Sequence, residues 1–254
     1  MQKALESTPG HTNLPYWLNK LGKAFSDRFQ HTGNVQDIDY AISHIQKAVE
    51  STSCDYADLP CWWNNLGNSY LGRFKHTKNL QDIDHAIFNH QKAVKSTPSG
   101  HDDHAHYLSN LGMSYSCHFK HTGNLQYIDH AISHMQKALE LSSGHTNLSP
   151  HRLNLGKAFA DRFQHTGNVQ DIDHAILHIQ TALESTPGHT NLPYWLNKLG
   201  KAFSDRFQHT SNIQDIDHAI SNMHIRKKSK VYRDRYSLYS THSAVASPLI
   251  YCAL

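Results

Sequence analysis

Residues 63–70 read "WNNLGNSY", and their central Leu-Gly pair recurs along the chain at an almost constant interval. Ala-Ile pairs in the same chain keep the same intervals of 45, 45, 44 and 44 residues. Two independent markers with one period indicate a true internal repeat. The Leu-Gly pairs begin at Leu21, Leu66, Leu111, Leu155 and Leu199, and the Ala-Ile pairs at Ala41, Ala86, Ala131, Ala175 and Ala219.

Each repeat has the pattern of two amphipathic helices, because apolar side chains recur every three or four residues. Pro15 falls in the first turn of the first helix, where its missing N–H costs nothing. One repeat cannot bury its own apolar stripe, but stacked repeats can. We therefore predict an all-α superhelix, or solenoid, of about five helix pairs. The stripes of the first repeat are Leu14, Leu18, Leu21, Phe25 and Phe29, then Val35, Ile38, Ile42, Ile45 and Val49.

The two ends of the chain depart from the repeat pattern. The opening "MQKALE" matches Met135–Glu140, in the second half of a second helix, and Arg226 stands where earlier repeats have alanine. We expect an excerpt of a longer array, whose uncapped ends invite end-to-end self-association. The expected parts are the end of a truncated repeat at 1–10, repeats at 11–55, 56–100, 101–144, 145–188 and 189–225, and a basic, disordered or non-native tail at 226–254.

The stretch "RFQHTGNVQDID", residues 28–39, combines a histidine with two aspartates and so suggests a metal or proton-transfer site. Its five copies argue against that reading. The aspartate at position 37 becomes Tyr127 in the third repeat, and the glycine at position 33 becomes Lys78 and Ser211 in two others. A chemical site would lose its function with such changes, whereas a turn would lose only some stability.

We interpret this stretch as a hinge between the two helices of a repeat. Gly33 suits a left-handed position after the first helix, and Asn34 suits the cap of the second. Asp37 is expected to form a partial capping box with Asn34. His31 is expected at the end of the first helix, where partial positive charge is favourable. The aspartates at position 39 and its equivalents fall in the first turn of the second helix.

Charge, cysteines and hydropathy exclude several classes of protein. The net charge is +3, but residues 226–254 contribute +5, so the repeated part is slightly acidic and has no electrostatic footprint for nucleic acid. The cysteines, Cys54, Cys61, Cys117 and Cys252, show no CxxC spacing, so we expect reduced thiols in the cytoplasm. The sequence has no apolar run of ~18 residues, and we expect no membrane partner.

Histidine pairs offer an alternative reading as a metal binder. His130 with His134 and His174 with His178 have i, i+4 spacing, and "HDDHAH" at 101–106 is dense in possible ligands. The pair is not kept in the other repeats, and no acidic third ligand recurs beside it. We therefore expect no metal site, no cofactor and no catalytic activity, with weak metal affinity as the competing hypothesis.

Trp63, Leu66, Gly67 and Tyr70 have the spacing W-x2-L-G-x2-Y, and Ala86, Ala93 and Pro98 continue it. This resembles the tetratricopeptide repeat (TPR), although the repeats here exceed the standard length of about 34 residues. The longer unit is similar to repeats of the kinesin-light-chain type. The pattern "LNxLGxxFxxRFxxTGNxxDIDxAI" resembles TPR arrays of basidiomycete fungi, which often accompany a CHAT protease or a nucleotide-binding domain. The resemblance covers about residues 1–225.

The resemblance implies a protein–protein interaction scaffold that binds a peptide or protein in a concave groove lined by the first helices. The family's carboxylate-clamp pattern is not reproduced, since Leu153 and Arg152 replace the residues found at Asn19 and Leu18, and the first helix of repeat four should begin looser or shifted. A regulatory fragment of a larger signalling protein stays open as the alternative. The expected groove residues are Asn19, Lys23, Asn64, Asn68, Ser109, Met113, Lys157, Asn197 and Lys201.

Overall fold

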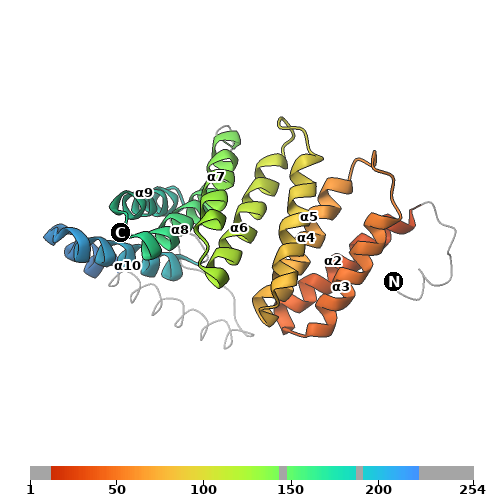
Figure 1. Cartoon of the computed structure of the whole chain (residues 1–254), viewed down its shortest axis with the longest axis horizontal. Coiled ribbons are helices and arrows are strands. Elements are labelled where there is room, and N and C mark those ends of the chain that lie inside the picture. The colour runs from red at the N-terminus through yellow and green to blue at the C-terminus, as the bar shows by residue number, and fades with distance from the viewer. Residues whose placement is uncertain (1–12, 143–147, 187–190, 223–254) are drawn as a thin grey trace, which may run out of the picture.

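The structure is a computed structural model that describes residues 13–142, 148–186 and 191–222. All regular structure in these residues is α-helical (Figure 1). The parts expected at 1–10 and 226–254 lie outside the described residues. The helices are α2 (Leu14–Thr32), α3 (Val35–Glu50), α4 (Leu59–Thr77), α5 (Leu80–Lys95), α6 (His104–Thr122), α7 (Leu125–Leu141), α8 (Ser149–Thr166), α9 (Val169–Ser185) and α10 (Leu192–Thr210), and residues 213–222 are also helical.

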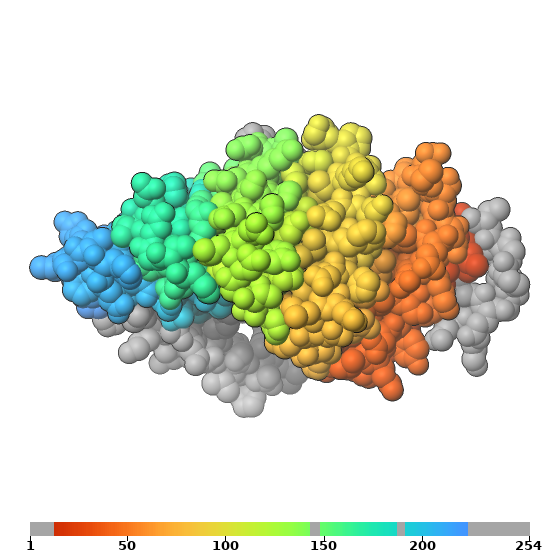
Figure 2. Space-filling model, viewed as in Figure 1, coloured from red at the N-terminus to blue at the C-terminus, as the bar shows by residue number. Residues whose placement is uncertain are grey.

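The helices pack as sequential antiparallel pairs, and each pair stacks on the next to form a superhelix. We call the first helix of each repeat an A helix (α2, α4, α6, α8 and α10) and the second a B helix (α3, α5, α7, α9 and residues 213–222). A helices of neighbouring repeats contact each other directly, which places them on the inner side of the stack. Figure 2 shows the successive repeats as adjoining bands along the long axis. The predicted all-α fold is confirmed.

The Leu-Gly signature marks the closest approach of the two helices in a repeat. A Cβ atom on Gly22 would lie 2.5 Å from a side-chain carbon of Ile45, and one on Gly156 would lie 2.9 Å from Ile179. The alanine of the Ala-Ile pair is fully buried in the first four repeats. Glycine and alanine recur at these positions because larger side chains would hold the helices apart.

The hinge after each A helix confirms two of the predicted roles. Gly33 has φ of 70° and is left-handed, as are Lys78 and Ser211 in the other copies, at φ of 62° and 57°. The Asn34 side chain accepts a hydrogen bond of 3.0 Å from the backbone N–H of Gln36. The equivalent asparagines do the same in every repeat, so each B helix starts with the same cap.

The predicted capping box between Asn34 and Asp37 is wrong. The Asn34 backbone N–H donates instead to the Thr32 hydroxyl, at 3.2 Å, and this bond recurs in all five repeats. The Asp37 carboxylate turns toward Arg28 on the A helix, whose Nε donates to it at 2.7 Å. Hydrogen bonds from Arg28 hold the pKa of the Asp37 carboxyl below its usual value. A two-pronged guanidinium is a stronger partner than one backbone N–H.

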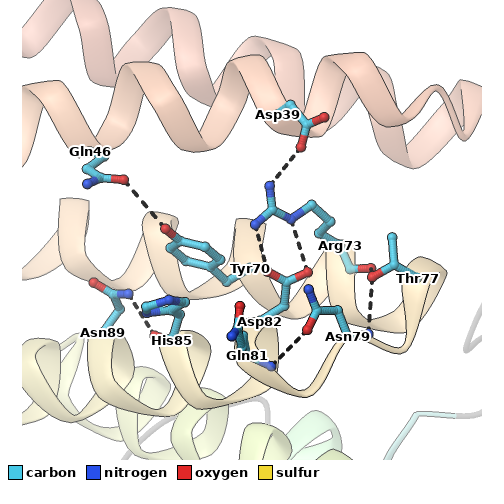
Figure 3. Close-up of polar contacts among 10 residues, drawn as sticks. All are labelled: Asp39, Gln46, Tyr70, Arg73, Thr77, Asn79, Gln81, Asp82, His85 and Asn89. Atoms are coloured by element: carbon cyan, nitrogen blue, oxygen red, sulfur yellow. Dashed lines mark hydrogen bonds and ion pairs between the residues drawn. The ribbon is translucent and has the colours of Figure 1, made fainter.

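Arg73, the equivalent arginine of the second repeat, joins two repeats as well as two helices (Figure 3). Its Nε and Nη2 donate to Asp82 at 3.0 and 2.6 Å, and its Nη1 donates to Asp39 of the preceding repeat at 2.7 Å. The first aspartate of the motif therefore closes its own hinge, and the second binds the next repeat. Arg162 and Arg206 repeat the arrangement, reaching back to Asp129 and Asp173.

The third repeat replaces this arginine and its first aspartate together. His118 stands at the arginine position and Tyr127 at the aspartate position, and their rings stack with centroids 3.7 Å apart. The Nε2 of His118 lies 3.4 Å from Asp84 of the preceding repeat. The change to Tyr127 is thus half of a paired exchange that keeps both the hinge contact and the contact between repeats.

The motif histidine lies in the last turn of its A helix, as expected, and also packs against the preceding repeat. The ring of His76 lies against Phe29, with centroids 5.9 Å apart, and the ring of His121 lies against Phe74 at 5.7 Å. His165 and His209 make the same contact with Phe119 and Phe163. The residues of the hinge motif that recur from repeat to repeat therefore hold a helix end or a neighbouring repeat in place.

The first helix of the fourth repeat begins later than its equivalents, as predicted. Helix α8 starts at Ser149, one position later relative to its Leu-Gly pair than the other A helices. Leu153, which replaces the asparagine of other repeats, is buried. None of the described helices is long and apolar enough to cross a membrane.

Candidate partner groove

The inner face of the first three repeats contains a hollow of about 750 Å³. Its walls come mainly from helices α2, α4 and α6, and Phe29, Met113 and Ile45 of α3 supply apolar surface. Amide, lysine and histidine side chains surround this apolar part. A partly open cavity with an apolar floor and polar rim has the general character of a ligand site.

Gly72 of α4 borders this hollow. The other repeats carry a side chain at the same position, namely Asp27, Cys117, Asp161 and Asp205. A Cβ atom on Gly72 would meet Phe29 and Ile38 at 3.6 and 3.8 Å, which are ordinary contact distances. Packing therefore does not demand glycine here, although glycine within a helix costs about 1 kcal/mol relative to alanine.

The nine predicted groove residues do not form one site. Four of them border the hollow: Lys23, Asn64, Asn68 and Met113. Lys157 and Lys201 border a separate, much smaller pocket between α8 and α10, of about 50 Å³. Asn197 is partly exposed, and it borders neither space.

Three of the predicted groove residues, Asn19, Asn64 and Ser109, have little exposed surface. All three are buried between neighbouring A helices. They accept hydrogen bonds from side-chain amides of the following repeat: Asn65 donates to Asn19 at 3.3 Å, Asn110 to Asn64 at 2.8 Å, and Asn154 to Ser109 at 3.5 Å. Buried polar groups need such partners, so this amide ladder joins the repeats rather than offering itself to a ligand.

The position after Leu-Gly does lie along the groove, where it carries Lys23, Asn68, Met113, Lys157 and Lys201 in turn. The amines of Lys23 and Lys201 pair with an aspartate one turn later, at 2.9 and 3.3 Å. At Lys157 the aspartate one turn later, Asp161, forms its ion pair with Lys120 instead, at 2.8 Å. Burial and the charge of Lys120 lower the pKa of Lys157.

Sequence reasoning missed Gly72, Lys75, His76 and His106, all of which border the hollow. Gly72 carried a readable signal, because it is the only glycine among the five residues at its repeat position. Lys75 and His76 lie between the Leu-Gly signature and the hinge, where the sequence shows only a continuous helical pattern and nothing that marks a binding residue. The hollow is formed by residues of three successive repeats, which no pattern within one repeat specifies.

The histidine pairs stack on aromatic rings instead of converging on a common point. His134 lies parallel to Tyr115, with centroids 5.7 Å apart, and His178 lies parallel to Phe159 at 5.9 Å. Burial lowers the pKa of His134, and lowers that of His178 to about 4. Among the residues that the structure describes, no group of three or more histidine, cysteine or acidic side chains could hold a metal ion.

The "HDDHAH" stretch is likewise divided among separate contacts. His104 shares a hydrogen bond of 3.0 Å with the backbone carbonyl of Thr97, and His106 contacts the Asn110 amide at 3.1 Å. His101 stays at the surface, 3.9 Å from Asp103. These partners belong to different helices and loops, so the stretch fixes the start of α6.

No protein-family model matches the sequence, and no curated protein is similar to it. Solved structures share its fold. A putative kinesin light chain of Podospora anserina with nearly identical TPR-like repeats matches with a TM-score of 0.64 at 11% identity, over 89% of this chain and 100% of that one. MamA matches with a TM-score of 0.56 at 17% identity, over 83% and 97% of the two chains. YrrB, described as a TPR protein with an unusual peptide-binding site, matches with a TM-score of 0.52 at 17% identity, over 90% and 96%.

These structures share the stacking of sequential helix pairs and little sequence. Together with the Leu-Gly contacts and the inner layer of A helices, they define the architecture. The described part of the chain has the fold of a tetratricopeptide-repeat superhelix.

Proposed function

We propose that the chain is a protein-interaction scaffold with repeats of the kinesin-light-chain type, and that it binds an extended segment of a partner protein in the hollow over α2, α4 and α6. The observation that carries this proposal is the hollow itself, about 750 Å³, at the one repeat with glycine in place of a side chain. In the proposal the chain acts by binding alone.

The chemistry of the hollow suits a peptide better than a compact small molecule. It is open along the groove, and its polar rim comes from three successive repeats, which matches the length of an extended chain. Side-chain amides such as Asn68 can hydrogen-bond a peptide backbone, while Met113 and Phe29 can receive an apolar side chain. The likeness to YrrB, which is described as having a peptide-binding site, is consistent with this use of the fold.

Gly72→Asp tests the proposal with a residue that the array already uses at three equivalent positions. A random dodecapeptide library displayed on phage would be selected on the wild-type chain, and the enriched peptides measured against both proteins. We expect wild-type binding and at least tenfold weaker binding to the variant, because the new side chain occupies the hollow.

Cys117→Asp is the matched control, since it makes the same kind of change on the same face of α6, outside the lining of the hollow. It should leave the affinity of the selected peptides unchanged. Peptides that bind the wild type and Gly72→Asp equally, or a library that yields no binder, would contradict the proposal.

A further inference from the structure

His90 of α5 occupies a position that is apolar in the neighbouring repeats, where Ile45, Met135 and Ile179 stand. Its side chain is fully buried, and its ring lies directly over Gly67 of the signature, where a Cβ atom would lie 2.6 Å from the ring. An imidazole here brings two polar nitrogens into the core, and each needs a partner.

Both nitrogens find partners on the two flanking A helices. Nδ1 lies 2.9 Å from the Ser114 hydroxyl, and Nε2 lies 3.3 Å from Oδ1 of Asn68. The equivalent serine of α4, Ser69, donates instead to a carbonyl of its own helix, at 3.0 Å. The Ser114 hydroxyl therefore bonds to His90 instead of to a backbone carbonyl of its own helix.

The protonation state follows from these partners. Burial lowers the pKa of His90 to about 3, so the ring is neutral at pH 7 and carries one N–H. The amide oxygen of Asn68 can only accept, which places the proton on Nε2. Nδ1 then accepts from the Ser114 hydroxyl, so both ring nitrogens have a partner.

This chain of bonds has a consequence for the groove, because Asn68 also borders the hollow. With its oxygen held by His90, its NH2 group is left for the groove side, and that group has no hydrogen-bond partner among the described residues. Lys75, about two turns further along α4, borders the same hollow and has no ion-pair partner in the described part of the chain. Both groups are donors.

We propose that His90 is a positioning residue that fixes the Asn68 amide with its NH2 toward the hollow, so that this point of the groove selects a carbonyl or carboxylate oxygen of the bound peptide. The inference rests on the proposed peptide binding and deepens it. Without His90 the amide can rotate and offer either end, and the selection for an acceptor is lost.

The tautomer of His90 is the first test and needs no ligand. Long-range 1H–15N spectra of the full chain labelled with 15N-histidine would report it, and His90→Ile identifies the His90 signals among 23 histidines by their disappearance. We expect a proton on Nε2 at pH 7, with no titration down to pH 5. A proton on Nδ1 would overturn the inference, because the Asn68 amide would then be reversed.

The second test measures the donor itself. Millimolar N-acetylglycine, which carries an amide carbonyl and a carboxylate, should shift the side-chain NH2 signals of Asn68, whereas ethylammonium should not. His90→Ile should weaken this response at least threefold while the melting temperature does not fall, since the first and fourth repeats hold isoleucine at the same position. An unchanged response in His90→Ile, or none in the wild type, would overturn the positioning role.

The two proposals fail separately. A peptide library that yields no binder would remove peptide capture and leave the tautomer and the acetylglycine result standing. A reversed Asn68 amide would remove the present inference and leave peptide capture intact.

Discussion

Two regions of the array are built from the same helices but vary differently from repeat to repeat. One is the hinge, residues 28–39 and their equivalents, which we call the hinge edge. The other is the inner face of the A helices, which carries the position after Leu-Gly and which we call the groove face. At the hinge, charged residues recur and are bonded to one another within and between repeats. Along the groove, the position after Leu-Gly changes from lysine to asparagine to methionine. We infer from this difference that the recurring charges stabilise the array. A binding site is better sought at positions where one repeat differs from the others.

The largest effect is expected at the hinge, from Arg73→Ala. The Asp82 side chain is only 3% exposed, and the change would leave its carboxylate without its guanidinium partner. Loss of one member of a buried pair is costly, so the free energy of unfolding should fall by about 3 kcal/mol. Urea denaturation followed by circular dichroism measures it. A loss below about 1 kcal/mol would mean that the arginine–aspartate pairs of the hinges contribute little to stability.

Two glycines of α4 sharpen the comparison. Gly67→Ala should cost about 2 kcal/mol, because its Cβ would collide with the buried His90 ring. Gly72→Ala should be neutral or stabilising by up to about 1 kcal/mol, since the new Cβ meets only ordinary contacts. Thermal denaturation of both variants checks this. Equal destabilisation would show that Gly72 is a packing requirement and would remove the reason for reading it as functional.

Mild acid should weaken the array through its buried histidines. Burial lowers the folded-state pKa of His90 to about 3, whereas an unfolded histidine has a pKa of about 6.5. The unfolded chain therefore binds more protons, and stability falls as pH drops from about 6.5 toward 3. Between pH 6.5 and 5.5 the wild type should lose about 1 kcal/mol more than His90→Ile. Parallel curves for the two proteins would show that His90 does not titrate on unfolding.

The smallest effect is expected for Asp39→Ala, which removes the link between repeats but leaves the hinge pair. The Asp39 side chain is 52% exposed, and exposed ion pairs contribute little, so the loss should be about 0.5 kcal/mol. Denaturation at low and high salt checks this, because such a contribution is screened by ions. A loss as large as that of Arg73→Ala would show that Arg73 stabilises the fold mainly through its ion pair with Asp39 of the preceding repeat, and not through its pair with Asp82 in the hinge.

The repeat, the helix pairs, the left-handed Gly33 and the Asn34 cap could all be predicted from the sequence. Each depends on residues within a few positions of one another, or on a period kept over the whole chain. The partner of Asp37 could not, because Arg28 lies nine residues away across a turn. Whether the two meet depends on the angle between the helices, which the hydrophobic pattern does not specify.

The groove was predicted only in part for a similar reason. Asn64 and Asn68 lie one turn apart on the same face of α4, so the helical pattern does not say which of the two a neighbouring helix covers. Both border the hollow, but the Asn64 side chain is buried and bonded to Asn110 of the next repeat, whereas Asn68 is partly exposed. The helical pattern alone treats both as polar surface.

The contrast between the two surfaces can be tested on one spectrum. A peptide selected on the wild-type chain would be titrated into 15N-labelled protein, and the shifted backbone and side-chain signals assigned. We predict that the shifts gather on the residues around the hollow, including Asn68, Gly72 and Lys75, and leave the hinge residues Arg73 and Asp82 unmoved. Shifts centred on the hinge edge, with the hollow unaffected, would contradict the assignment of binding to the groove and of structure to the recurring charges.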